Sequence, residues 1–186
     1  FLPHRQRSHS LDFGYVHPFV CQMWAIDPDG RMHLYREIYR TQTLVEDHAK
    51  EMLSLMDVRP DAIVCDHNAE DRATLDRHLD MSTQPARKTV SDGLQACAAR
   101  LRVQPDGKPR VFFHRGSVVK RDLILAEAGR PASTVEEITG YVWAQGNGVN
   151  PKEAPVKKDD DGMDGWRYAS MELDLGFRPR YRSFTY

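Results

Sequence analysis

Two apolar runs joined by a short turn constrain the fold of this chain more than any other feature. FVCQMWAI (19–26) is followed by the turn DPDG (27–30) and then by RMHLYREIY (31–39), whose side chains alternate between two faces. This pattern predicts an antiparallel β-hairpin. SLDFGY (10–15) precedes the hairpin and is also rich in strand-forming residues, so we predict an antiparallel meander of three strands.

The hydrophobic period changes to that of a helix after the meander. Apolar residues at helical spacing predict a helix over 45–56, with Thr43 as its N-cap and Glu46 completing a capping box. The apolar run 62–65 is typical of a strand buried on both faces. Two helices and one more strand are then expected, at 70–79, 91–101 and 110–114. The sequence therefore predicts an α/β fold whose mixed sheet is covered by helices on both faces.

The last third of the chain carries weaker signals. Helical segments are expected near 122–128 and 133–137, and 141–143 is compatible with a last short strand. Residues 146–158 are rich in Gly, Asn, Pro and Lys, which predicts an exposed loop. A helix then runs from Asp160 to about Met171, and it opens with acids where the helix dipole favours negative charge.

Composition limits the classes of protein that fit. A length of 186 residues with 40% hydrophobic content predicts a single domain over 1–186, with its core at about 10–170. No run of about 18 apolar residues and no signal-like start is present, so we expect an intracellular protein without a membrane partner. The net charge of −1 gives no overall attraction for nucleic acid, so any DNA contact is local or metal-mediated.

The three cysteines carry no metal or disulfide pattern. Cys21, Cys65 and Cys97 are widely spaced and form neither a CxxC pair nor a Cys/His ligand set. We expect reduced, mostly buried thiols.

Three carboxylates stand at unusual places in the predicted sheet. Asp12 interrupts the apolar first strand, where an acid is disfavoured. Asp66 follows the strand 62–65, and Asp164 lies in the first turns of the C-terminal helix. If the strand 62–65 pairs beside the first strand, these three acids converge.

Converging carboxylates offer the oxygen ligands that Mg²⁺ and Mn²⁺ prefer, and two such ions activate water and stabilise the leaving oxygen of a phosphodiester. Asp160 and Asp161 precede Asp164 by four and three residues and can share its helix face. Each acid also has a plain structural interpretation. An acid that directly follows a strand, as Asp66 does, is typical of a helix N-cap or a turn. The acidic run before Asp164 is typical of a solvated helix start, and Asp12 is compatible with a carboxylate that has no function. Their joint order is what favours a metal site.

The same segments resemble, in order, the nuclease domain of the large subunit of tailed-phage terminases, which has the ribonuclease H-like fold. LDFGYVHPF resembles the opening D-x-G-Y-x-x-P-F of that family, and KKDDDGMDGWRYA resembles its closing signature D-[DN]-H-x-x-D-A-x-R-Y-A. Three further segments match between them, namely HLYREIYRTQTLVEDHAKEM, IVCDHNAEDRATL and ARKTVSDGLQACAARL. The resemblance spans roughly residues 10 to 170.

The resemblance implies a metal-dependent endonuclease that cuts concatemeric viral DNA during genome packaging in the host cytoplasm. Asp12, Asp66 and Asp164 match the catalytic, metal-binding acids of the family, which implies two Mg²⁺ or Mn²⁺ ions as cofactors. Asp161 is a further candidate metal ligand and stands where the family often has a histidine. Gly165 replaces the usual alanine, which slightly weakens the helix. The implied partners are double-stranded DNA, an ATPase domain, the portal protein and the small terminase subunit.

The ATPase motor of that family is not expected within these residues. The chain has no G-x-x-x-x-G-K-[ST] motif, and its single Gly-Lys pair lies in a turn, at Gly107-Lys108. The start at Phe1 is in keeping with a processed product or an excised domain.

Basic residues near the acids are candidates for holding DNA through its phosphates. The first candidates are Lys88, Lys157 and Lys158, with Arg115, Lys120 and Arg121 behind them. Plain surface solvation is an open alternative for all six. Beside Asp12, we expect Tyr15 to pack and His17 to be exposed. Core or interface positions are expected for Trp24, Trp143 and Trp166.

Two other functions fit the same acids. A Holliday-junction resolvase or a transposase-like enzyme would use them on the same fold. A non-catalytic DNA-binding or assembly module would keep them as structural groups. Much faster cutting of branched than of plain duplex DNA would favour a resolvase over a packaging nuclease. Unchanged metal binding and stability in an Asp12→Asn variant, with no plasmid cutting by the wild type, would favour the non-catalytic module.

Overall fold

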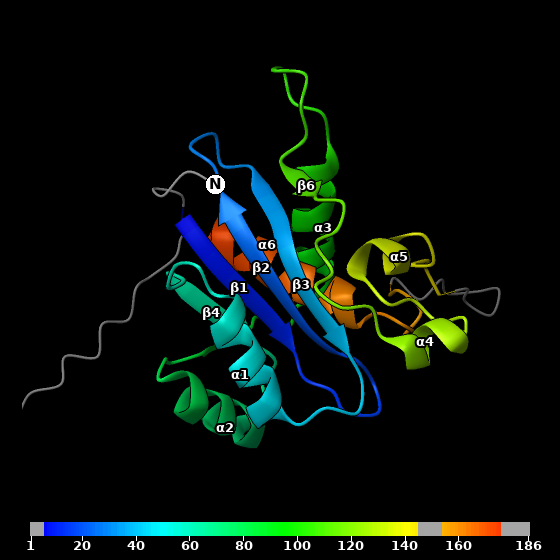
Figure 1. Cartoon of the computed structure of the whole chain (residues 1–186). Helices are drawn as coiled ribbons and strands as arrows, with labels where there is room; N and C mark the ends of the chain where they lie inside the picture. Colours follow the sequence, from blue (N-terminus) through cyan, green and yellow to red (C-terminus); the bar gives the residue numbers. More distant parts are fainter. Residues whose placement is uncertain (1–5, 145–153, 176–186) are drawn as a thin grey trace, which may run out of the picture.

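The computed structural model of the chain describes residues 6–144 and 154–175, and a six-stranded mixed sheet forms its centre (Figure 1). The strand order is β5-β4-β1-β2-β3-β6. The bounds are β1 (Gln6–Asp12), β2 (Phe19–Ile26), β3 (Met32–Arg40), β4 (Ala62–Cys65), β5 (Gln84–Pro85) and β6 (Val111–Phe113). The first three strands form the predicted antiparallel meander, and β4, β5 and β6 add to it in parallel pairings.

Helices cover both faces of this sheet (Figure 1). α1 (Val45–Leu55) and α2 (Ala69–Leu79) lie on one face, and α3 (Val90–Leu101) and α6 (Asp161–Asp174) lie on the other. Two short helices, α4 (Leu123–Glu127) and α5 (Thr134–Ile138), lie beside the β3 side of the sheet. The predicted α/β fold, with a mixed sheet begun by a meander and covered on both faces, is confirmed.

The period of two along β1 decides which residues face which layer. Leu11 belongs to the apolar core under α1 and α2. Ser10 faces the opposite layer, where it contacts Trp24 in the core that α6 covers. Asp12 shares the face of Ser10, so the strand presents this acid to α6.

Several local predictions were wrong in detail. α1 begins at Val45 with Leu44 as N-cap and no side-chain cap, because the hydroxyl of Thr43 donates instead to the carbonyl of Thr41 (3.1 Å). β5 was missed because two residues, one of them a proline, show no hydrophobic periodicity.

Residues 141–143 form no strand in the described part of the chain; Trp143 makes only an isolated bridge to Pro155. Residues 146–153 of the predicted loop 146–158 lie outside the described residues.

Burial separates the aromatic predictions. Trp24 and Trp166 are buried, as expected, whereas Trp143 is 61% exposed, so of the two predicted positions, core or interface, the core position is wrong for Trp143. Tyr15 is also exposed rather than packed, and His17 is exposed as expected. The three cysteines are buried free thiols. None of the helices within 6–144 and 154–175 has the length and apolar character that crossing a membrane requires.

Buried His48 makes the fold sensitive to acid. Its ring stacks on Phe19 (centroids 3.8 Å apart), and burial, followed by the charge of Arg40, lowers its pKa to about 4. Because the unfolded value is 6.5, His48 contributes full stability above that pH and loses its contribution as the pH falls towards 4. His48→Phe should flatten the pH dependence of the unfolding free energy between these values by up to about 1.4 kcal/mol per pH unit. Urea denaturation at several pH values measures this slope, and an unchanged slope would contradict the assignment.

Candidate active site

Parallel pairing of β1 with β4 brings the first two acids together. Leu11 is in register with Cys65, and the backbone N–H of Asp66 donates to the carbonyl of Leu11 (3.1 Å). Asp12 is the last residue of β1, and Asp66 directly follows β4. Both acids therefore lie at the same end of these two neighbouring strands.

The position of Asp12 differs from the predicted one. The strand ends at Asp12 instead of continuing through Tyr15. The cause is a tight turn at Gly14, where a Cβ would lie 2.5 Å from the carbonyl oxygens of both His17 and Pro18. An acid at a strand end conflicts far less with strand propensity than an acid within a strand.

Helix α6 brings the C-terminal acids to the same edge. It packs against β1, β2 and β4, and its first turn contains Asp161 and Asp164. Asp160 is the N-cap, and its carbonyl accepts from the N–H of Asp164 (2.8 Å). The guanidinium of buried Arg167, one turn further on, donates to the carboxylate of Asp164 and fixes its direction.

Asp12 is affected both by burial and by the charges of the three other acids. Burial raises the pKa of Asp12 well above its ordinary value, and the charges of Asp164, Asp161 and Asp66 raise it further. Burial also raises the pKa of Asp161 to about 6, and His17 partly offsets this. Burial and, after it, repulsion between neighbouring acids therefore disfavour the charged forms of Asp12 and Asp161.

Two lysine ammonium groups supply positive charge at this site. Lys88 forms an ion pair with Asp66, and the Nζ of Lys157 lies 2.9 Å from Asp160 Oδ2 and 3.2 Å from Asp164 Oδ2. Although burial acts the other way, Lys88 and the N–H of His67 lower the pKa of Asp66. Burial likewise lowers the pKa of Lys157, but Asp160 and Asp164 outweigh it and the pKa is raised.

The donor set fits a hard divalent cation. The four carboxylates Asp12, Asp66, Asp161 and Asp164 offer oxygen ligands, which Mg²⁺ and Mn²⁺ prefer. Within the described residues, no three His, Cys, Asp or Glu side chains are arranged to hold a metal ion as they stand. Instead, Asp66 forms an ion pair with Lys88, and Asp164 forms ion pairs with Lys157 and Arg167.

A chain of buried polar groups fixes α6 on the sheet. The indole of Trp24 donates to Ser10 Oγ (3.0 Å), whose hydroxyl donates to Gln22 Oε1 (3.1 Å). Gln22 Nε2 then donates to Thr134 Oγ1 (2.6 Å) and to the carbonyl of Gly162 (2.7 Å). The start of α6 is thereby tied to β1 and β2, which also carry Asp12 to the site.

Buried Glu137 caps α6 from outside the helix. Its carboxylate accepts from the N–H groups of Gly162 (2.9 Å) and Met163 (2.8 Å) and from the hydroxyl of Tyr39. Burial raises its pKa to about 8, against the effect of these hydrogen bonds. The sequence pattern predicts Glu137 only as the last residue of a short helix, since nothing in the local sequence signals a contact 25 residues away.

Glycines allow the close approach of α6. A Cβ at Gly165 would lie 3.1 Å from Gln22 Oε1, so this glycine makes room for Gln22, which the prediction of a weakened helix did not foresee. A Cβ at Gly162 would overlap the hydroxyl of Thr134 and lie 3.0 Å from its Cα.

Gly162→Ala is therefore expected to destabilise the protein by about 1–3 kcal/mol, because overpacking outweighs the gain of about 1 kcal/mol in helix propensity. Urea denaturation measures the change. Gly140→Ala is the matched control, since its nearest neighbour would lie 3.7 Å away. A stabilised Gly162→Ala variant would contradict the close approach.

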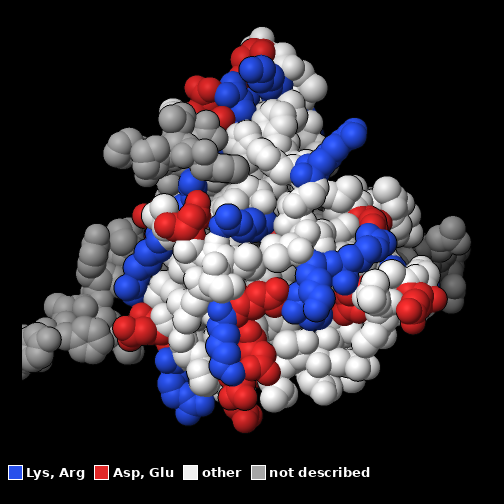
Figure 2. Space-filling model, in the orientation of Figure 1, with Lys and Arg blue, Asp and Glu red and all other residues white. Residues whose placement is uncertain are grey.

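The other basic candidates differ from Lys88 and Lys157. Arg121 pairs with Glu136 (2.6 Å). Among the described residues, Arg115, Lys120 and Lys158 form no ion pair with the acids of the site. On the face that carries α1 and α2, basic and acidic side chains are interspersed, so that face offers no continuous basic surface (Figure 2).

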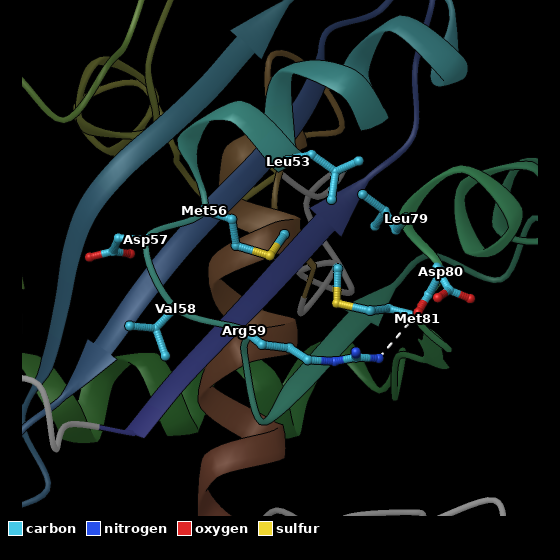
Figure 3. Close-up of a pocket in the computed structure, with 8 residues that line it drawn as sticks. All are labelled: Leu53, Met56, Asp57, Val58, Arg59, Leu79, Asp80 and Met81. Atoms are coloured by element: carbon cyan, nitrogen blue, oxygen red, sulfur yellow. Dashed lines mark hydrogen bonds between the residues drawn. The ribbon is translucent and has the colours of Figure 1, made fainter.

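A separate hollow lies at the ends of α1 and α2, away from the acids. It has a volume of about 280 Å³ and is lined mainly by apolar side chains together with Asp57, Arg59 and Asp80 (Figure 3). Arg59 donates to the carbonyl of Asp80 (3.1 Å) across it. None of the predicted site residues lines this hollow.

Comparison with known proteins identifies the fold. No protein-family model matches the sequence, and no curated protein matches it. Among solved structures, the large terminase of a thermophilic bacteriophage, in complex with ADP, matches 95% of this chain with a TM-score of 0.72 and 19% identity. The P22 large terminase nuclease domain matches 97% of this chain and 87% of its own length, with a TM-score of 0.66 and 16% identity. The nuclease domain of the SPP1 large terminase g2p, solved with bound Mn, matches 91% of this chain and 86% of its own length, with a TM-score of 0.63 and 17% identity.

The fold is therefore ribonuclease H-like. More narrowly, it is the fold of the nuclease domains of phage large terminases, as the sequence motifs predicted. The chain spans 41% of the length of the large terminase from the thermophilic phage.

Proposed function

We propose that this chain is a metal-dependent endodeoxyribonuclease that cuts concatemeric viral DNA during genome packaging. The observation that carries the proposal is the convergence of Asp12, Asp66 and Asp164, from two adjacent strand ends and one helix start, on the fold of terminase nuclease domains. The raised pKa of Asp12, which burial causes first and the neighbouring acids second, supports the proposal, because a bound cation would favour the charged form of this carboxyl group.

Asp12, Asp66 and Asp164 would hold two Mg²⁺ or Mn²⁺ ions, with Asp161 as a further ligand. When bound, such ions lower the pKa of a water and stabilise charge on the leaving oxygen. The SPP1 nuclease domain was solved with bound Mn, which supports a divalent ion here. Arg167 would keep Asp164 aimed into the site.

The substrate would be double-stranded DNA, and the wider assembly would include the ATPase domain, the portal protein and the small terminase subunit, in the host cytoplasm. Lys88, Lys157 and Lys158 would contact phosphates beside the cut. The similarity to the large terminase of the thermophilic phage supports the link to packaging.

The test is cleavage of supercoiled plasmid by the purified chain. We expect nicked and linear products with Mn²⁺ and none with EDTA. Intact plasmid at every Mn²⁺ concentration would overturn the nuclease proposal. Cutting of four-way junctions far faster than of plain duplex would instead assign the chain to the junction resolvases.

Lys157 is expected to compete with metal for the acids and to hold DNA. Lys157→Ala should tighten Mn²⁺ binding by up to about fivefold, the equivalent of an exposed ion pair of about 1 kcal/mol or less. It should also weaken DNA binding. The salt slope, which is the steepness with which the logarithm of the DNA binding constant falls with the logarithm of the salt concentration, should decrease by about 0.9. Isothermal titration and fluorescence anisotropy measure the two effects.

Lys158→Ala is the matched control for Lys157→Ala. Lys158 is exposed and makes no ion pair with the described acids, so its loss should reduce the salt slope and leave Mn²⁺ affinity unchanged. Equal Mn²⁺ affinities for both variants would contradict the competition.

A further inference from the structure

The turn that follows Asp12 exposes two apolar side chains beside the acid site. Tyr15 is 52% exposed, and Val16 is 76% exposed, more than any other large apolar side chain of the described residues. His17, the next residue, lies close enough to Asp161 to influence its pKa. Exposed apolar residues are ordinary on protein surfaces, and Leu123–Ile124 and Val142–Trp143 are also adjacent exposed pairs. Tyr15–Val16 differs from them because it follows Asp12 of the acid site by only three residues.

The turn is held in place at both ends. Before it, Phe13 packs against the core and against Phe19 (ring centroids 6.1 Å apart). Close packing at Gly14 fixes the chain, and the carbonyl of Tyr15 accepts from the N–H of Gln42 (2.8 Å). The exposed side chains therefore project from a fixed backbone, which reduces the entropy that a bound partner must remove.

We infer that the Tyr15–Val16 turn packs against the sugar and base of the nucleotides flanking the cut phosphate, as an uncharged contact to duplex DNA. This inference rests on the proposed nuclease function. Tyr15 is three residues from Asp12, so their Cα atoms are at most about 10 Å apart. A phosphodiester at the acids would bring its neighbouring nucleotides within reach of the turn.

The chemistry of the turn selects the part of DNA that it contacts. The stretch SLDFGYVHPF contains no Lys or Arg, so it offers no strong partner for phosphate. An aromatic ring and an isopropyl group instead fit sugars and the faces of unstacked bases. Such uncharged contacts release no counterions, so they add nothing to the salt dependence of binding. Apolar side chains that insert between base steps of a duplex partly unstack them, and the Tyr15–Val16 turn would act in this way.

The test uses a Tyr15→Ala/Val16→Ser double variant and a duplex carrying 2-aminopurine, with Ca²⁺ in place of Mn²⁺ to suppress cutting. We expect affinity to fall about tenfold at every salt concentration, with the salt slope unchanged. The 2-aminopurine signal that wild type raises on binding should be lost in the variant. Mn²⁺ affinity and melting temperature should stay as in wild type.

Two further variants complete the test. Tyr15→Phe should retain binding, because the ring carries the contact. Val103→Ser removes a residue that is 69% exposed after α3, and it should have no effect. Unchanged affinity of the double variant, or a loss that tracks the salt slope, would overturn the inference. Plasmid cutting by the wild-type protein tests the proposed nuclease function separately. A wild-type protein that binds no DNA would overturn both the nuclease function and the contact of the Tyr15–Val16 turn with DNA.

Discussion

Asp12→Asn is expected to abolish DNA cleavage and at the same time to stabilise the metal-free protein. Cleavage should fall by at least roughly 10²–10³-fold, as when one electrostatic partner of a transition state is removed. Stability should rise because burial and three neighbouring acids disfavour the charged form of Asp12, as its raised pKa shows. A substitution that merely damaged the fold would lower both.

Plasmid cleavage and thermal melting with and without Mn²⁺ measure these opposite effects. Mn²⁺ should raise the melting temperature of wild type and raise that of Asp12→Asn much less. Asp29→Asn is the matched control, since Asp29 lies in the exposed β2–β3 turn and should leave cleavage unchanged. If Asp12→Asn retained wild-type cleavage, the acids would not be the catalytic centre.

Glu137→Ala is expected to cost about 3 kcal/mol or more of unfolding free energy. It leaves the N–H groups of Gly162 and Met163 and the hydroxyl of Tyr39 without their buried acceptor, at about 1–3 kcal/mol each. Chemical denaturation measures the loss. Mn²⁺ affinity should fall as well, because the first turn of α6 carries Asp161 and Asp164.

Two variants calibrate this result. Glu137→Gln keeps the shape and one acceptor oxygen but points an amide donor at other donors, so an intermediate loss is expected. Glu127→Ala changes an exposed glutamate at the end of α4 and should stay within about 0.5 kcal/mol of wild type. A loss as small for Glu137→Ala as for Glu127→Ala would show that the cap contributes little.

The predictable part of this molecule is the part governed by local periodicity. The meander, the main helices and the placing of Asp66 after a buried strand follow from spacing and turn residues alone. Convergence of Asp12 with Asp66 was conditional on strand pairing, and the β1–β4 register meets that condition. The end of the first strand was misplaced, because a turn set by Gly14 depends on packing that propensity does not include.

The polar contacts around the acids were beyond such prediction. Gln22 reaches Gly162 across 140 residues, and Glu37 accepts from the backbone of Thr134 across 97. Buried polar side chains in a strand are a signal that partners exist, but they do not say which. The ion pair of Lys88 with Asp66 likewise depends on how two loops meet at one sheet edge.

The acid site is divided between two parts of the molecule, the central strands and the start of a helix packed on them. Asp12 and Asp66 end adjacent strands in the interior of the sheet, whereas Asp161 and Asp164 belong to a helix held there by polar contacts and close packing. Local opening that releases the start of α6 would disassemble the site while the hydrogen-bonded strands stay protected. The local opening of the start of α6, which amide exchange measures, and not the melting of the whole fold would then set the temperature at which the site is lost.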